Sequence, residues 1–343
     1  MKEAITGFLL DDLKQRIIGL GQPGYRAKQV LEWVYKKNVI SFSQMKNIPA
    51  DLKQLMDEKF CVTDLITQEK LVSKDKTAKY LFRTHDGELI EAVLIPTQKR
   101  TTVCISTQAG CGYGCTFCAS GIGGLKRNLF VSEIVSQVLL IEQDNPHRSI
   151  TNIVIMGMGE PLANYENTLK AVRIMNSPDG IGIAARKITI STCGLPEQIL
   201  HLAQEGIQVE LSVSLHAAND ALRDDLMPIN KKYNIAKLIK TVKEYTKLTH
   251  RIVTFEYIVI GGVNDSKIDA QGLASLLKGV RCKVNLIPFN PVEGLAFDPP
   301  RPLNIAQIDQ MLKDSLINVT IRRSRGVDIK GACGQLRAEV ESR

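Results

Sequence analysis

From residue 100 onward, apolar segments typical of strands alternate with segments of helical periodicity. Strands are predicted at residues 101–106, 151–156, 187–192, 208–214, 252–260, 282–288 and 318–322. Helices are predicted between them, at residues 131–144, 164–176, 196–205, 219–225, 235–247, 266–278 and 304–316. Repeated βα units form parallel strands joined by right-handed crossovers. Six such units are fewer than the eight of a closed barrel, so the pattern predicts a partial barrel with its site at the carboxyl ends of the strands.

The first hundred residues follow two other patterns. Helical periodicity predicts three helices with basic residues on their polar sides, at 8–20, 25–37 and 49–59. Alternation predicts two strands, 79–83 and 89–95, around a Gly-containing hairpin turn. We therefore expect a helical module, a hairpin extension or linker, a barrel core and a C-terminal segment, at residues 1–61, 62–97, 98–332 and 333–343.

Charge and composition narrow the class of protein. The 44 basic and 36 acidic residues give a net charge of +8, which suits a polyanionic partner such as RNA, although a basic solvated surface is a common alternative. No stretch approaches the ~20 apolar residues of a membrane span. Asp11 and Asp12 interrupt the N-terminal apolar residues, which does not fit a signal peptide. Eight unevenly spaced cysteines do not suit a disulfide framework, so we expect a cytoplasmic protein.

Three cysteines, Cys111, Cys115 and Cys118, lie on one short segment with Gly112 and Gly114 between them. Structural zinc sites usually have four protein ligands, and iron–sulfur clusters normally have four thiolates. Three thiols on one loop can hold three irons of a 4Fe–4S cluster and leave the fourth iron open. Three unrelated buried cysteines are the alternative, and the interleaved glycines make it less favourable, because they suit a chain that wraps closely around an inorganic core.

Polar and Gly-rich residues follow several of the predicted barrel strands. The strand at 151–156 ends in Gly-Met-Gly-Glu-Pro, where two glycines allow close backbone approach to a ligand and Glu160 can accept a hydrogen bond from an amine or hydroxyl. Other strands end at residues 191–194, 214–216 and 289–291 in similar polar segments. Each alone could be a helix cap or a turn. At the same end of one barrel, they together predict a small-molecule site.

The cysteine loop, the Gly-Glu turn and the partial barrel together resemble the radical S-adenosylmethionine (SAM) superfamily. More closely, residues 104–111, 157–161, 214–216, 227–230, 284–291 and 331–336 are similar to the RlmN family of RNA adenine C2-methyltransferases, and the similarity covers nearly the whole chain. The pair Cys104 and Cys333 is its most specific feature. The resemblance implies an α/β fold, a partial (βα)6 radical SAM barrel. The related Cfr group, which methylates C8 of the same ribosomal adenine, is the alternative; Pro161 favours RlmN, since Cfr-type sequences tend to carry Ala there.

The resemblance also implies the ligands of the cofactors. Cys111, Cys115 and Cys118 would hold one 4Fe–4S cluster per chain, whose open iron binds the amine and carboxylate of SAM. The remaining contacts to SAM would come from Gly159, Glu160, Ser191, Ser214, Leu215, His216 and Asn290.

The implied reaction uses two molecules of SAM per turnover, because adenine C2 is not a nucleophile and cannot take a methyl group by ordinary transfer. Cys333 accepts the methyl group of one SAM. The second SAM, cleaved by an electron from the cluster, gives a 5′-deoxyadenosyl radical that takes a hydrogen from that methyl, and the product adds to C2. Glu91 matches the proposed proton acceptor, although an isolated Glu on a hairpin is more often an edge residue. Cys104 then attacks the sulfur of Cys333, and the transient disulfide frees the base.

Three cysteines match no catalytic position and keep a structural interpretation: Cys61, Cys193 and Cys282. The implied substrates are an adenine of the peptidyl-transferase centre in 23S rRNA, protein-free or in early assembly, and an adenine beside the tRNA anticodon. Basic residues of the N-terminal helices and of residues 322–325 would contact phosphates. A flavodoxin or ferredoxin would supply electrons to a monomeric enzyme. Two other classes remain: a non-catalytic RNA-binding module with a structural metal, and a radical SAM enzyme acting on a peptide or metabolite.

Overall fold

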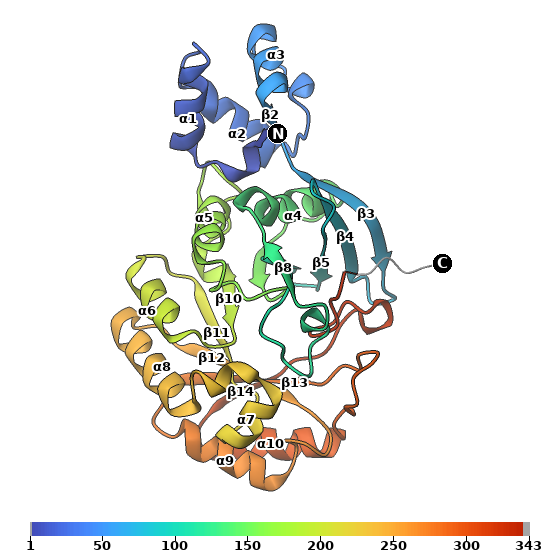
Figure 1. Cartoon of the computed structure of the whole chain (residues 1–343), viewed down its shortest axis with the longest axis vertical. Helices are drawn as coiled ribbons and strands as arrows, with labels where there is room; N and C mark the ends of the chain where they lie inside the picture. The colour runs from blue at the N-terminus through green and yellow to red at the C-terminus, as the bar shows by residue number, and fades with distance from the viewer. Residues whose placement is uncertain (1, 339–343) are drawn as a thin grey trace.

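The computed structural model describes residues 2–338. A small helical module lies at one end of a larger body of strands and helices (Figure 1). Within residues 2–338, no helix has both the length and the apolar character needed to cross a membrane.

A ten-stranded sheet forms the larger body, and its strand order is β14-β13-β12-β11-β10-β9-β6-β5-β4-β3. Seven strands are parallel and follow one another in chain order: β6 (Thr101–Cys104), β9 (Asn152–Ile155), β10 (Ile188–Thr192), β11 (Glu210–Ser214), β12 (Val253–Val259), β13 (Cys282–Pro288) and β14 (Asn318–Ile321). Helices connect them: α4 (Val131–Gln143), α5 (Tyr165–Asn176), α6 (Pro196–Gln204), α7 (Asp220–Leu226), α8 (Ile235–Thr249), α9 (Lys267–Leu277) and α10 (Pro302–Asp314). The predicted partial barrel of six βα units is present.

Local sequence explains where these elements begin. The amide oxygens of Asn219 and Asn234 accept hydrogen bonds from the first turns of α7 and α8, and Ser266 caps α9 in the same way. On β10 the buried Ile188 and Ile190 alternate with half-buried polar residues. Alternation of this kind directs apolar side chains to one face of the sheet and polar ones to the other.

The hairpin is continuous with the barrel. Strands β3 (Leu65–Val72), β4 (Ala78–Thr84) and β5 (Leu89–Pro96) extend the sheet in antiparallel fashion, and β5 pairs with β6 so that Val93 lies opposite Cys104. The sequence predicted β4 and β5 but not β3, because only Leu65 of β3 is buried and the strand shows no clear alternation. The pairing brings the hairpin residue Glu91 beside the first barrel strand.

The helical module consists of α1 (Leu10–Gly19), α2 (Arg26–Lys36) and α3 (Ala50–Lys59), close to the predicted ranges; β1 (Glu3–Ala4) pairs with β2 (Phe60–Cys61) beside them. It docks on the barrel through specific polar contacts. Thr6 Oγ1 lies 2.9 Å from Ser136 Oγ of α4, and Lys36 Nζ donates to Gly180 O at 2.9 Å. Lys36 therefore has a structural contact, although it is one of the basic residues expected to face RNA. Residues 339–343 of the predicted C-terminal segment lie outside the described residues.

Candidate active site

The cysteine loop lies between two short antiparallel strands, β7 (Gln108–Gly110) and β8 (Leu125–Asn128). Gly110 has φ +74°, and a Cβ there would lie 2.0 Å from the carbonyl oxygen of Gly124. Only glycine fits this position, because its backbone conformation is left-handed and the two ends of the loop meet there. Cys111 N donates to the same carbonyl at 3.1 Å, which closes the loop.

Burial affects all three thiols of this loop. Burial, and then the charge of Cys118, raises the pKa of Cys111 to about 11; burial also raises the pKa values of Cys115 and Cys118. A group of thiols that resists ionisation by itself becomes fully ionised when it coordinates metal. Among residues 2–338, His85, Asp86 and Glu133 form a group whose ligand atoms lie within 4.8 Å of one another, and this group includes none of the three thiols.

The Gly-Glu turn after β9 joins three strand ends. Gly159 has φ +95°, and a Cβ there would lie 2.4 Å from the Cβ of Gln108, so the turn packs directly against β7. The Glu160 carboxylate is buried and accepts hydrogen bonds from Leu162 N at 2.9 Å and from Cys193 N at 2.7 Å. Burial raises the pKa of Glu160 above its ordinary value, and the hydrogen bonds from Cys193 N and Leu162 N offset only part of this increase. Each carboxylate oxygen retains lone-pair capacity for a ligand.

His216 follows β11 and is fixed in one protonation state. Its Nδ1 accepts a hydrogen bond from Ile258 N at 3.0 Å, so any proton on the neutral ring lies on Nε2. Burial, and then the charge of Arg223, lowers the pKa of His216 to about 3, which keeps the ring neutral at physiological pH. The ring meets Phe117 of the cysteine loop edge-on, with the ring centroids 4.8 Å apart.

The other residues predicted to contact SAM lie at neighbouring strand ends. Ser191 and Ser214 are half-buried near the carboxyl ends of the adjacent strands β10 and β11, whereas Leu215 is fully buried. Asn290 follows β13, and its amide Nδ2 donates to the carbonyl oxygen of Cys333 at 3.2 Å. The structure therefore gathers these residues at one end of the barrel.

Glu91 and Cys104 lie on adjacent strands. The Glu91 carboxylate is buried and makes an ion pair with Lys79, with Nζ 2.8 Å from Oε1. Its Oε2 accepts a hydrogen bond from the backbone N–H of Arg337 at 2.9 Å. Cys104 is buried in a small apolar cluster with Leu336, and burial, followed by the charge of Cys333, raises its pKa to about 12.

The segment that carries Cys333 is held between the cysteine loop and the end of β13. Besides the bond from Asn290, it is fastened by Ala119 N donating to Gly334 O at 2.8 Å and Ser120 Oγ donating to Leu336 O at 2.6 Å. The Cys333 side chain is accessible to solvent, yet burial raises its pKa, while the charge of Arg322 lowers it. Both properties are expected of a thiol that is reached by solvent from one side and surrounded by protein on the others.

Comparison with known proteins identifies the family. The radical SAM superfamily matches residues 105–270, and the ribosomal RNA large subunit methyltransferase N-terminal domain matches residues 4–62. A probable dual-specificity RNA methyltransferase RlmN from Staphylococcus aureus, strain JH9, is 46% identical over 347 residues, which cover 100% of this chain and 95% of the relative. The chain belongs to the RlmN family of radical SAM RNA methyltransferases.

Solved structures agree with this assignment. The crystal structure of a radical SAM methyltransferase from Sphaerobacter thermophilus has a TM-score of 0.96 and 45% identity, over 98% of this chain and 100% of that chain. The maturase HydG from Carboxydothermus hydrogenoformans shares the barrel fold alone, with a TM-score of 0.50 and 16% identity, over 66% of this chain and 55% of that chain. The predicted fold class is confirmed. As a radical SAM enzyme of the RlmN family, the chain uses a 4Fe–4S cluster and SAM.

Sequence reasoning missed three charged residues that surround the RlmN-type site. Lys79 neutralises Glu91 along a diagonal of the hairpin, because the register places Leu81 opposite Glu91 and Lys79 opposite Val93. Arg322 is expected from the sequence to contact phosphates at the surface, but it is half-buried, its Nη1 lies 3.4 Å from Met156 Sδ, and its charge acts on the thiols of Cys104 and Cys333. Arg223 is completely buried, and nothing in its local sequence indicated this.

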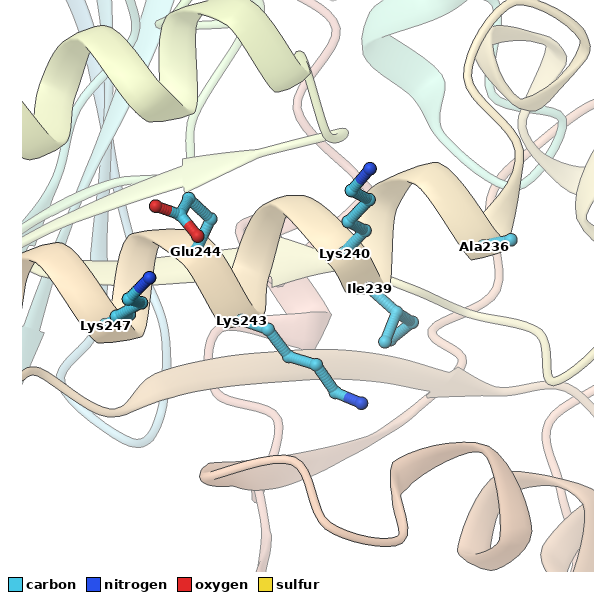
Figure 2. A pocket seen from close by; sticks show the side chains of 6 residues that line it. All are labelled: Ala236, Ile239, Lys240, Lys243, Glu244 and Lys247. Carbon is cyan, nitrogen blue, oxygen red and sulfur yellow. The ribbon is translucent and has the colours of Figure 1, made fainter.

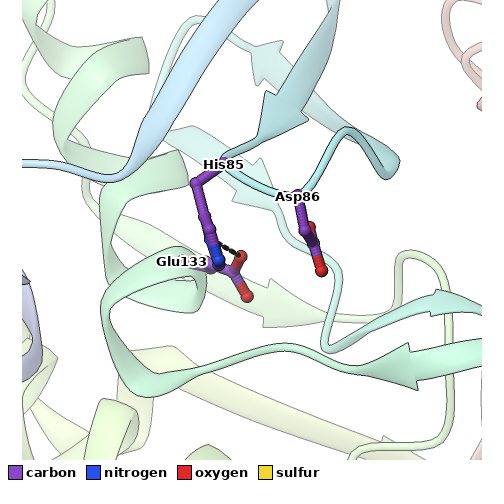
Figure 3. Close-up of side chains that lie close together, drawn as sticks. All are labelled: His85, Asp86 and Glu133. Carbon is purple, nitrogen blue, oxygen red and sulfur yellow. Dashed lines mark ion pairs between the residues drawn. The ribbon is translucent and has the colours of Figure 1, made fainter. Parts of the chain in front are cut away.

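The group His85, Asp86 and Glu133 is an ion-pair network (Figure 3). The guanidinium of Arg127 donates to both oxygens of Asp86 at 2.6 and 2.7 Å, and to both oxygens of Glu133 at 2.6 and 2.7 Å. It already supplies the positive charge that a metal ion would bring. The network joins the hairpin turn to β8 and to the start of α4, and so supports the strand that leads out of the cysteine loop.

A hollow of about 410 Å³ lies along α8 (Figure 2). The residues that line it all come from this helix: Ala236, Ile239, Lys240, Lys243, Glu244 and Lys247. The hollow includes no residue of the candidate active site, and Lys243 points to a different side of the helix from Lys240. We assign it no part in the chemistry.

Proposed function

We propose that this protein methylates C2 of adenine in RNA, through a methyl group carried on Cys333. The observation that supports this most strongly is the approach of three distant segments to one another. Glu91 on β5 accepts a hydrogen bond from the segment that carries Cys333, and Leu336 of that segment belongs to the same buried apolar cluster as Cys104 on β6. A general base, a methyl carrier and a second thiol are the groups that this reaction needs.

The proposed ligands of the cofactors are those predicted from the sequence. Cys111, Cys115 and Cys118 would hold one cluster per chain, and when bound it supplies the electron that cleaves SAM. The strand-end residues Gly159, Glu160, Ser191, Ser214, Leu215, His216 and Asn290 would bind and orient SAM. Asn290 contacts the Cys333 backbone, so it would link the bound SAM to the methyl carrier.

The roles of the other residues follow from their surroundings. Cys333 is accessible and can accept a methyl group, at the cost of one molecule of SAM per turnover, while a second molecule provides the radical. Glu91 would remove the proton from C2 as the new C–C bond is completed. Cys104 is protonated at neutral pH because its pKa is raised to about 12, so it must lose its proton before it attacks the sulfur of Cys333. As the disulfide forms, the C–S bond to the base would break, the methylene carbon would take a proton to become the methyl group, and the remaining unpaired electron would return to the cluster.

The proposed substrates are 23S rRNA and tRNA, because the Staphylococcus aureus relatives are described as dual-specificity RNA methyltransferases and the net charge of +8 favours a polyanion. The target adenine would have to leave its stack to reach the barrel, which favours an unpaired base. We further propose that the protein is a cytoplasmic monomer whose cluster is reduced by a flavodoxin or ferredoxin. Its proposed parts are a helical RNA-binding module at residues 1–61, a hairpin extension at 62–97, a core at 98–332 and a methyl-carrying segment at 333–343.

One experiment tests the reaction. The cluster is reconstituted without oxygen, SAM labelled in its methyl group is supplied with 23S rRNA fragments or tRNA, and the product is digested to nucleosides. Label at C2 of adenosine supports the proposal. Label at C8 would instead indicate the Cfr-type reaction, and no label in RNA would reject both.

A further inference from the structure

Arg223 is a completely buried arginine at the edge of the predicted SAM site, and the reaction described above gives it no role. It lies on α7 and is 0% exposed. Arginine is rarely buried in this way, because removing a charge from water is costly unless the group is well paired and hydrogen-bonded. Its surroundings therefore indicate what the buried charge is for.

The guanidinium holds together the ends of two barrel strands. Nη2 donates to Cys193 O at 2.9 Å and to Ser214 O at 3.0 Å, and Nε donates to Leu215 O at 3.1 Å. These carbonyls belong to the segments after β10 and at the end of β11, which carry Ser191, Ser214 and Leu215. Arg223 thus fixes the backbone of the strand ends that are proposed to bind SAM.

The acceptors in direct contact with this guanidinium are neutral. They are the backbone carbonyls and the side-chain oxygen of Asn230, which accepts from Nη1 at 2.8 Å. The nearest acidic groups act through Asn230, whose amide donates to Asp220 Oδ1 at 3.0 Å and to Asp224 Oδ1 at 2.7 Å. The positive charge is therefore only partly compensated in the buried interior, where charges interact over longer distances than in water.

The same helix contacts the cysteine loop. Thr116, between Cys115 and Cys118, donates its backbone N–H to Leu226 O at the end of α7, at 3.1 Å. Arg223 lies three residues before Leu226 on α7, so this short helix connects the buried guanidinium to the cysteine loop. A negatively charged cluster on this loop would lie within the field of Arg223.

We infer that Arg223 is a positioning residue that aligns the ends of β10 and β11 for SAM and places a buried positive charge that favours the reduced cluster. Reduction adds one electron and no proton, so the cluster becomes more negative by one charge, and a nearby cation stabilises that state. Net charge and surrounding dipoles are known to set the potentials of such clusters. The inference rests on the proposed assignment of Cys111, Cys115 and Cys118 as ligands.

The test separates charge from geometry. Arg223→Lys retains a positive charge but loses the planar fork that reaches three carbonyls. We expect the midpoint potential of its cluster, measured by dithionite titration and electron paramagnetic resonance, to stay near that of the wild type, and SAM to bind about tenfold more weakly. Arg223→Gln should bind SAM weakly and also have a more negative potential. Arg173→Gln, at an exposed arginine, controls for the substitution itself.

A second pair of variants leaves Arg223 in place. Asp224→Asn removes a carboxylate near Arg223 and should make the potential more positive, whereas Asp225→Asn, at the exposed neighbouring position, should change it less. Equal midpoint potentials in Asp224→Asn and Asp225→Asn would overturn the claim that the buried charge favours the reduced cluster. Wild-type SAM affinity in Arg223→Lys would overturn the claim that Arg223 aligns the strand ends for SAM. The ligand assignment is tested separately by the iron content of Cys115→Ser. If that variant retains a full cluster, the assignment fails, whatever the result at Arg223.

Discussion

The two halves of the candidate active site are built in different ways. On the SAM side, the buried side chains Glu160, His216 and Arg223 are hydrogen-bonded to the backbone of neighbouring strand ends. On the transfer side, Glu91 and Cys333 come from segments 242 residues apart in the sequence, and the Cys333 side chain is exposed.

This difference suits two different tasks, because one half would hold a cofactor still and the other would have to open for the substrate base. A site that orients a cofactor gains from a backbone that is fixed in advance. In the proposed mechanism the transfer side admits an adenine between Cys333, Glu91 and Cys104, whereas here Leu336 shares a buried apolar cluster with Cys104 and Arg337 N donates to one oxygen of Glu91. Under that mechanism these contacts would have to break when the base enters. We therefore expect substitutions on the transfer side to affect turnover, and substitutions on the SAM side to affect binding and stability.

The largest effect is expected for Cys333→Ala. Without the methyl carrier, transfer of label from SAM to RNA should fall by a factor of about 10³ or more, because the covalent route is removed. Iron content and SAM affinity should stay unchanged, since this thiol is not a predicted ligand. The control is Cys282→Ala, a half-buried cysteine of β13 with no proposed role. Methylation of C2 by the Cys333→Ala enzyme would refute the proposed mechanism.

Cys104→Ala should stop the reaction one step later. The methylene bridge between Cys333 and the base would form, but no thiol would be available to release it, so RNA should remain covalently attached to the protein. Denaturing gel electrophoresis with labelled RNA detects the complex. Free methylated RNA produced over many turnovers would show that Cys104 is not the releasing thiol.

Glu91→Gln should reduce kcat by about 10²–10⁴-fold, the range for loss of a general base. The amide retains the shape of the side chain and can still accept the hydrogen bond from Arg337 N, so binding of SAM should not change. Single-turnover kinetics with labelled SAM, together with the SAM affinity, measure the two quantities. A loss of affinity with an unchanged kcat would assign Glu91 to binding instead.

The smallest effect concerns stability on the SAM side. The pKa of His216 is about 3 in the folded chain against 6.5 ordinarily, so between these values the unfolded chain binds more protons. The free energy of unfolding of the cluster-free protein should therefore decrease as the pH falls from 6.5 towards 3, with a contribution from His216 of up to about 1.4 kcal/mol per pH unit.

His216→Asn tests this contribution. Asn tolerates the positive φ of 59° at this position, and its amide oxygen can accept the hydrogen bond from Ile258 N. The variant cannot take up a proton, so its free energy of unfolding should depend less on pH than that of the wild type. Urea unfolding followed by circular dichroism at several pH values measures the difference. Identical slopes would mean that His216 is not a buried neutral ring.

Much of the fold could be predicted because its signals are local. The seven barrel strands and their helices follow from periodicity, and residues such as Asn219 and Ser266 fix where helices begin. β3 was not predicted, because most side chains of this edge strand are exposed and its apolar and polar residues do not alternate clearly. Likewise, Cys111, Cys115 and Cys118 lie close together in the sequence, so the cysteine loop could be recognised without a structure.

The sequence by itself determined the order of the elements and the cysteine loop, and its resemblance to the RlmN family led to the prediction that Cys104 and Cys333 act together. Only the tertiary structure decided that Lys79 neutralises Glu91, that Leu336 shares a buried cluster with Cys104, and that Arg223 donates to the backbone at the end of β11. The physical reason is that these contacts depend on burial and on strand register between distant segments. A charged residue in a sequence looks the same whether water or a row of backbone carbonyls surrounds it.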